Sequence, residues 1–217
     1  MWILCCALQA HLIPGFNNLL VLNAVQFTPD AKPYTMYLNF DKAVVGLIIL
    51  GTTLKLVNSW QEWKILFKQI MYELPIIVPA IILIIILSII FNYIKFELKF
   101  PQLLWIWGIN NLFFTCIAEE ALWRGFVQES LTKFKYQYSE YIALLISAIF
   151  FGLAHFPGGG KYVLLATIAG VLYGWVYKVT KRIEASILTH FTLNLVHILF
   201  FTYPALKLFY KALTVCG

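Results

Sequence analysis

The stretch "LPIIVPAIILIIILSIIFNYI", residues 74–94, decides the fold class of this chain. Its 21 residues include no charged side chain, and about 20 apolar residues of helix cross the roughly 30 Å hydrocarbon core of a bilayer. Because lipid offers the backbone no hydrogen-bond partners, a segment that spans it must satisfy its own peptide groups, as a helix does. The stretch therefore predicts a transmembrane helix.

The rest of the chain has the same character. Of its 217 residues, 61% are hydrophobic and 12% are charged, against about 45–50% and 25% in a soluble domain. We predict an all-α fold, a polytopic transmembrane bundle of about seven or eight helices in a lipid bilayer. The net charge of +6 includes no dense basic run, which argues against a nucleic-acid partner. Six further apolar segments are expected at residues 1–13, 43–58, 102–131, 139–156, 161–178 and 185–206.

The chain divides by composition into three parts. Residues 1–101 are expected to hold the N-terminal transmembrane segments and a loop, residues 102–206 the core with the polar motifs, and residues 207–217 a tail. The loop begins at Pro14 and contains two further prolines, which interrupt regular structure. The cysteines follow no CxxC pattern and predict neither a disulfide framework nor a thiolate metal site; they are Cys5, Cys6, Cys116 and Cys216.

Small residues and basic residues give two further expectations. Ala166, Gly170 and Gly174 recur every four residues, a spacing that lets membrane helices approach closely. The basic residues fall into two nearly equal sets at opposite ends of the predicted bundle. The slightly larger set is expected on the cytoplasmic side; it comprises positions 55, 64, 68, 133, 135, 178, 181 and 182, against 32, 42, 95, 99, 161, 207 and 211.

The motif "TCIAEEALWRGF" at residues 115–126 carries three charged residues, and the first of them follows nineteen uncharged residues, 100–118. On a helix Glu120 and Arg124 lie on one face and can form an ion pair, whereas Glu119 is rotated by about 100°. A charge near the centre of a bilayer costs at least ~2.5–3.5 kcal/mol, so these side chains must face the bundle interior or a cavity. A buried ion pair that fixes helix packing explains Glu120 and Arg124. It leaves Glu119 without a structural role.

Two later segments also carry polar side chains. "FFGLAHFPGGG", residues 150–160, places His155 on the face of Phe151, just before a proline and three glycines. "ILTHFTLNLVHIL", residues 187–199, places His190 and Asn194 on one face, with His197 three residues beyond. Ionisable groups within transmembrane segments are functional by default. For His197 a packing role is the more natural interpretation.

These residues permit two kinds of chemistry. In the first, Glu119 is a general base for water, His155 holds or shares the proton, and His190 and Asn194 stabilise an oxyanion. In the second, Glu119, His155 and His190 bind one Zn²⁺ or another divalent metal, with water in the fourth position. The residues alone do not choose between the two.

The three motifs in this order, EExxxR, FxxxH and HxxxN, resemble those of the CPBP family (CAAX proteases and bacteriocin-processing proteins, also called the ABI family). The resemblance covers about residues 102–206. It implies an intramembrane endopeptidase of the CAAX prenyl protease 2-like type. Its catalytic residues would be Glu119, His155, His190 and Asn194, and Glu120 with Arg124 would be a supporting ion pair.

The resemblance also implies a substrate and a location. The substrate is expected to be a membrane-associated peptide or protein. The small size suits the prokaryotic branch, hence a multi-pass protein of the inner (plasma) membrane. Two other classes remain open, an ion- or proton-coupled transporter and a non-catalytic immunity protein. One geometric difficulty is that His155 lies ~24 Å along its segment and His190 only ~8 Å along its own. Tilt, or a fifth segment whose glycine-rich end dips into the membrane, is needed to bring them together.

Overall fold

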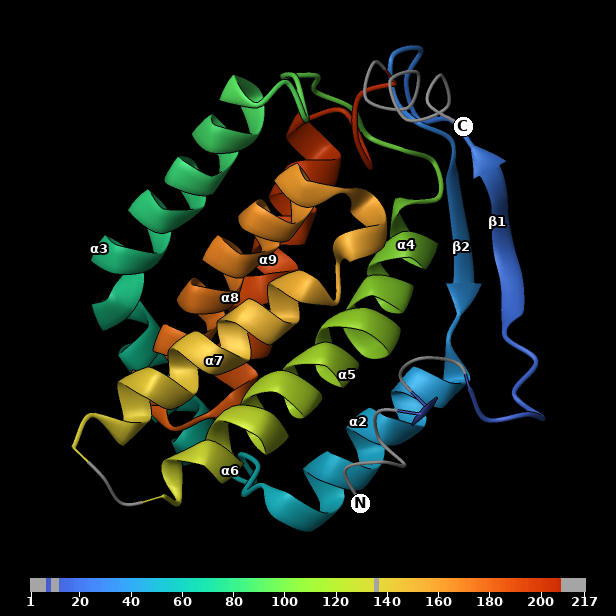
Figure 1. The fold of residues 1–217 in the computed structure, drawn as a ribbon. Coiled ribbons are helices and arrows are strands. Elements are labelled where there is room, and N and C mark those ends of the chain that lie inside the picture. The colour runs from blue at the N-terminus through green and yellow to red at the C-terminus, as the bar shows by residue number, and fades with distance from the viewer. Residues whose placement is uncertain (1–6, 9–11, 135–136, 208–217) are drawn as a thin grey trace.

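A computed structural model describes residues 7–8, 12–134 and 137–207 of the chain (Figure 1). Of the described residues, 68% are helical. Five stand-alone helices and one composite helix make up the described bundle. The stand-alone helices are α2 (Phe40–Thr53), α3 (Trp60–Ile90), α7 (Ser139–Leu153), α8 (Gly160–Thr180) and α9 (Ile183–Phe200).

The composite helix covers residues 104–132 and contains two π-helical stretches. Its parts are α4 (Leu104–Asn110), η1 (Asn111–Cys116), α5 (Ile117–Glu120), η2 (Ala121–Gln128) and α6 (Glu129–Thr132). The residue at each junction keeps right-handed helical backbone angles, so the chain does not break between the parts. It corresponds to the apolar segment expected at 102–131.

The expected count of seven or eight helices is not confirmed. The described residues form six helices, and most of the apolar segment at 1–13 lies outside them. The expectation of an all-α chain needs a correction too, since strands β1 (Leu19–Val25) and β2 (Tyr34–Leu38) form an antiparallel hairpin within the proline-containing loop. Each strand buries one side chain, Leu22 and Met36, against Trp107 of α4 and Ile198 of α9. With so little of it buried, the hairpin leaves no clear alternation in the sequence.

Three of the described helices, α3, α8 and α9, are long and apolar enough to cross a membrane. Residues 74–90 of the uncharged stretch form the second half of α3, which extends to 31 residues, or about 46 Å at 1.5 Å per residue. Large apolar side chains of α3 point outward, among them Ile82, Leu83 and Ile90. Such exposure is costly in water and natural in lipid, where helix surfaces are as apolar as the acyl chains.

Glycines bring α7 and α8 together. A Cβ at Gly170 would lie 3.1 Å from the Ala148 Cα, and one at Gly174 would lie 2.9 Å from Gln128 Oε1. These two residues therefore make the close approaches that their spacing predicts.

Figure 1 shows α7 crossing the bundle obliquely and ending near its middle, where a turn leads into α8.

We predict that Gly152→Ala lowers the free energy of unfolding by about 1–3 kcal/mol, the usual cost of overpacking. A Cβ there would overlap the Thr167 hydroxyl and come within 2.8 Å of the Val163 carbonyl oxygen. The matched control is Gly108→Ala in α4, where no described atom lies within 4 Å of the new Cβ. This variant should raise the free energy of unfolding by about 0.5–1 kcal/mol, because alanine loses less conformational entropy than glycine when a helix forms. Unfolding in detergent measures both, and equal effects of the two variants would contradict the packing assigned to Gly152.

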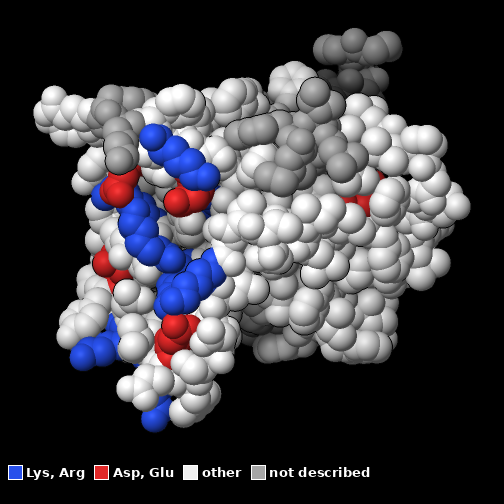
Figure 2. All heavy atoms as spheres, turned by 90° about the horizontal axis from the view of Figure 1, so that it is seen from below, with Lys and Arg blue, Asp and Glu red and all other residues white. Residues whose placement is uncertain are grey.

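Charged side chains gather at the ends of the bundle. Seen from below, most of the visible charged side chains lie in one part of the face (Figure 2). Lys181 binds Glu140 at 2.9 Å and Arg182 binds Glu62 at 3.3 Å, joining the ends of α3, α7 and α8. At the other end Lys95 pairs with Asp30, and this hydrogen bond lowers the pKa of the Asp30 carboxyl. Ionic groups thus flank the apolar middle on both sides, as a bilayer requires.

Candidate active site

Two adjacent glutamates lie on α5, a single helical turn between two π-helical stretches. π-Helical stretches inside helices are frequent at functional sites, since the extra residue rotates the following side chains. Glu120 is fully buried, whereas Glu119 is half-buried. The two carboxylates therefore enter different surroundings.

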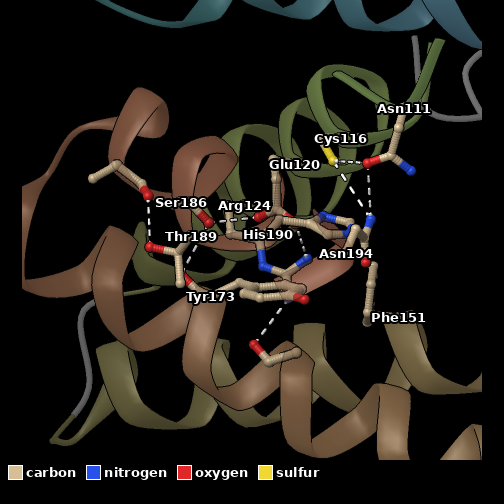
Figure 3. Close-up of polar contacts among 12 residues, drawn as sticks. Asn111, Cys116, Glu120, Arg124, Phe151, Tyr173, Ser186, Thr189, His190 and Asn194 are labelled. Carbon is tan, nitrogen blue, oxygen red and sulfur yellow. Dashed lines mark hydrogen bonds and ion pairs between the residues drawn. The ribbon is translucent and has the colours of Figure 1, made fainter. Parts of the chain in front are cut away.

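The Glu120 carboxylate is the centre of a buried hydrogen-bond network (Figure 3). Its Oε1 accepts from Arg124 Nη1 at 3.2 Å and from His190 Nδ1 at 2.8 Å. Its Oε2 accepts from the Ser186 hydroxyl at 2.5 Å. Charged acceptors make roughly twice as strong a hydrogen bond as neutral ones, so the Glu120 carboxylate connects α5 firmly to α9. Both of its oxygens are occupied, which leaves Glu120 no freedom to act on a substrate.

Arg124 forms the ion pair with Glu120 that the i, i+4 spacing predicts, and neither side chain is exposed. Its Nη2 donates to the Gly170 carbonyl oxygen of α8 at 2.9 Å. The guanidinium also lies over two aromatic rings, 4.6 Å from the centroid of Phe151 and 5.3 Å from that of Tyr173. Cation–π contacts of this kind stabilise a desolvated cation. Arg124 thus links α7, α8 and the composite helix.

The His190 ring is held in one orientation. It stacks on Tyr173 with centroids 4.5 Å apart and an interplanar angle of 17°, and the Phe151 ring meets it edge-on at 5.9 Å. Because Nδ1 bonds to Glu120, the free ring nitrogen is Nε2. A carboxylate that binds one nitrogen of a histidine fixes the tautomer and orients the other nitrogen.

His155 follows the last turn of α7 and reaches the same place. Its Nδ1 donates to the Phe151 carbonyl oxygen at 2.7 Å. In the neutral ring Nε2 is therefore a hydrogen-bond acceptor. The ring lies between Phe151, at 4.7 Å, and Tyr162, at 5.1 Å. Phe151 therefore contacts both His155 and His190. The oblique path and short length of α7 remove the difficulty raised by the offset of the two histidines.

Asn194 lies one turn after His190 on α9. Its amide nitrogen donates to Asn111 Oδ1 at 3.2 Å and approaches Cys116 Sγ at 3.7 Å. The amide nitrogen therefore has one oxygen acceptor and one sulfur acceptor, and sulfur is the weaker of the two. His197 behaves differently, since its Nε2 bonds to the Thr202 carbonyl oxygen at 3.1 Å and its ring packs on Tyr203 at 5.0 Å. These contacts agree with a packing role for His197.

A cavity of about 210 Å³ brings the four predicted catalytic residues together. Oε2 of Glu119 is buried there with no hydrogen-bond partner among the described residues. A buried polar atom without a partner is rare and calls for an explanation. The lining residues are Tyr34, Tyr93, Asn111, Thr115, Glu119, His155, Tyr162, His190, Asn194, His197, Tyr203 and Pro204.

Comparison with known families agrees with this geometry. Residues 101–196 match the family described as Type II CAAX prenyl endopeptidase Rce1-like. The chain is similar to that family over this part of its length. The matched part includes all three motifs, which confirms the resemblance to the CPBP proteases. No curated protein and no solved structure gives a match. Together with the three apolar helices, the Rce1-like match identifies an integral membrane protein of a protease family.

The described residues do not support the metal site that Glu119, His155 and His190 suggested. No three His, Cys, Asp or Glu side chains within 7–8, 12–134 and 137–207 are grouped so as to hold one ion. Glu119 lines the same cavity as both histidines without forming a three-ligand set. A metalloprotease is therefore not supported.

Several residues of the site were missed by sequence reasoning. Tyr173, Ser186, Asn111 and Tyr162 orient or surround the predicted residues. Asn111 carried a usable signal, because an asparagine inside an uncharged nineteen-residue stretch must find a partner. The other three carried none, since tyrosine and serine are ordinary in membrane helices.

Proposed function

We propose that the protein is an intramembrane endopeptidase that hydrolyses a peptide bond of a membrane-associated peptide or protein. One observation supports this most strongly. Glu119 lines a cavity together with His155, His190 and Asn194, and its buried Oε2 has no hydrogen-bond partner among the described residues. The adjacent Glu120, by contrast, has both oxygens occupied. The free carboxylate is positioned to act on water.

The proposed reaction begins with water between Glu119 and the substrate carbonyl. Glu119 accepts one proton as the hydroxide oxygen bonds to the carbonyl carbon, and the carbonyl oxygen becomes an oxyanion. Asn194 donates to that oxyanion an amide N–H that exchanges its weak acceptor, Cys116 Sγ, for the charged oxygen. When the C–N bond breaks, the leaving amine takes the proton that Glu119 received. His155 shares this proton through its Nε2, and the products are a carboxylic acid and an amine.

The charge of the buried cluster supports such proton transfer. Two carboxylates and one guanidinium leave one uncompensated negative charge when Glu119 and Glu120 are both ionised, and buried net charge is costly. One added proton neutralises the cluster. On His190 it would make Nε2 a donor to the oxyanion, and the Glu120 carboxylate at 2.8 Å stabilises that charged form.

The setting follows from the same residues. We place the catalytic region at 102–206 within a multi-pass protein of a prokaryotic inner (plasma) membrane. Its substrate would approach through or along the bilayer, since the cavity lies among the apolar helices α8 and α9.

The experiment uses full-length protein in proteoliposomes with a library of membrane-anchored peptides, and mass spectrometry detects the fragments. Wild type should cut at least one peptide at a defined bond, and His155→Ala should cut it at least about a hundredfold more slowly. His197→Ala is the control, because that ring also lines the cavity but is engaged by Thr202. Undiminished cleavage by His155→Ala would remove His155 from the mechanism.

Removal of metal gives a further prediction. Because no three described ligands are grouped around one ion, dialysis against a strong chelator should leave the cleavage rate within about twofold, well below the effect of losing a general base. Elemental analysis of the dialysed, active protein should find far less than one equivalent of zinc. Complete inactivation that zinc reverses would contradict the proposed mechanism.

A further inference from the structure

The β-hairpin precedes the part of the chain that matches the Rce1-like family, yet it contributes a side chain to the site. The match begins at residue 101, and Tyr34, the first residue of β2, lines the cavity of about 210 Å³ together with Glu119 and Asn194. This cavity is called the catalytic cavity below. Tyr34 is half-buried, and it has no role in the reaction proposed above.

Backbone hydrogen bonds hold the hairpin against the segment that follows α9. The Lys32 N–H donates to the Ala205 carbonyl oxygen at 2.9 Å, and the Lys207 N–H donates to the Asp30 carbonyl oxygen at 2.8 Å. An isolated two-stranded hairpin is at best marginally stable, so these contacts are needed to fix its position. The main chain just before Tyr34 is therefore anchored to the rest of the protein.

The ring of Tyr34 belongs to an aromatic cluster centred on Tyr203. The two rings meet edge-on with centroids 5.1 Å apart, an arrangement that aromatic pairs favour. Phe27 of the hairpin contacts both tyrosines, each at 5.9 Å. Tyr203 also contacts Trp107 of α4 at 5.8 Å and His197 of α9 at 5.0 Å. Rings from three parts of the fold thus fix the orientation of Tyr34.

Hydrogen bonds give the Tyr34 hydroxyl a defined direction. Trp107 Nε1, which can only donate, donates to the Tyr203 hydroxyl at 3.0 Å. Burial raises the pKa of Tyr34 above its ordinary value, and hydrogen bonds from Tyr203 and Trp107 partly oppose this rise, as donors to its oxygen do. Tyr34 therefore stays protonated and accepts from its neighbours. Its one O–H makes no hydrogen bond to the residues that the structure describes.

We propose that the Tyr34 hydroxyl donates a hydrogen bond to the oxyanion that forms on the substrate carbonyl in the catalytic cavity, and that Tyr203 and Trp107 position it. This inference rests on the proposed function. Hydrogen bonds in a chain polarise one another, so the bonds from Trp107 through Tyr203 strengthen Tyr34 as a donor. A neutral hydroxyl also avoids the cost of burying another charge. The hairpin is then part of the active site.

The kinetic test uses Tyr34→Phe in proteoliposomes with a peptide that wild type cuts. The variant should lower kcat by about 10²–10³, the usual effect of losing one oxyanion donor. KM should stay within about twofold, because the donor acts in the transition state and not on the bound substrate. The ring and its aromatic contacts remain, so melting in detergent should match wild type. Tyr203→Phe should lower kcat less, since it removes only a group that positions Tyr34.

Tyr37→Phe is the matched control. Tyr37 lies on the same strand, is 44% exposed and does not line the catalytic cavity. The variant loses the same hydroxyl group from the hairpin, so kcat and KM should both stay within about twofold. Equal kcat values for Tyr34→Phe and Tyr37→Phe would overturn the proposal.

A binding measurement separates failure of this proposal from failure of the proposed function. The protein is Glu119→Gln in detergent, with and without Tyr34→Phe, and ligand-observed NMR gives the affinities. One probe is N-acetyl-dialanine amide. The other has a phosphinic group and a methylene in place of its central peptide bond, and the phosphinic oxygens stand in for the oxyanion. Tyr34→Phe should weaken binding of the phosphinic probe by at least about tenfold and that of the peptide by less than about twofold.

Equal losses for the two probes, or an unchanged affinity for the phosphinic probe, would contradict the role given to Tyr34. Neither result depends on turnover. If wild type cut no peptide, the proposed function would fail while the binding data still decided whether Tyr34 is a donor. If wild type cut peptides and Tyr34→Phe kept its kcat, the donor role alone would fail.

Discussion

Glu119→Gln should lower the rate of peptide cleavage by at least about a thousandfold, within the 10²–10⁴ range for loss of a general base. Glutamine has the size of glutamate but cannot accept the proton from water. The variant should fold as well as wild type, because Oε2 of Glu119 has no described partner to lose. Initial rates in proteoliposomes and melting in detergent measure the two effects separately.

Glu140→Gln is the control for the general effect of removing a carboxylate. Glu140 is an exposed residue that pairs with Lys181 at one end of the bundle, so its loss should leave the rate within about twofold, as exposed ion pairs contribute little. If Glu119→Gln retained the wild-type rate, the carboxylate would have no part in the reaction.

Arg124→Met should have the largest effect on stability, a loss of about 3–5 kcal/mol. The substitution removes the charge partner of Glu120 and the hydrogen bond to Gly170, and it leaves a carboxylate buried with 0% exposure. Methionine keeps the length of the side chain, so the loss is chiefly electrostatic. Denaturant unfolding in detergent gives the difference.

Arg182→Met is the matched control, because the Arg182–Glu62 pair is partly exposed, at 22% for each side chain. It should cost no more than about 1 kcal/mol. A second substitution separates the causes: Glu120→Leu added to Arg124→Met removes the unpaired charge and should recover part of the stability. Equal losses for Arg182→Met and Arg124→Met would contradict the special role given to the buried pair.

Features that depend on neighbours in sequence could be predicted. The uncharged stretch at 74–94 predicted a helix that α3 contains. The four-residue spacings predicted the Glu120–Arg124 ion pair and the close approaches at Gly170 and Gly174. The ion pair and the glycine contacts follow from the spacing of residues along a helix, and this spacing can be read from a single sequence.

Contacts between distant segments could not be derived in the same way. Ser186 and His190 reach Glu120 across 66 and 70 residues, and no local pattern shows which helix faces which. The three motifs suggested that Glu119, His155, His190 and Asn194 converge, but not that His190 would be held by Glu120. The hairpin was missed because it has few buried side chains to impose an alternation.

The most direct test of the central claim, that Glu119 directs water onto a peptide bond, is cleavage in water enriched in heavy oxygen. Wild type in proteoliposomes should yield an N-terminal fragment with one heavy oxygen in its new carboxyl group, and Glu119→Gln should leave the same peptide intact. Mass spectrometry of the fragments measures both. Fragments without the label, or labelled equally by wild type and Glu119→Gln, would contradict it.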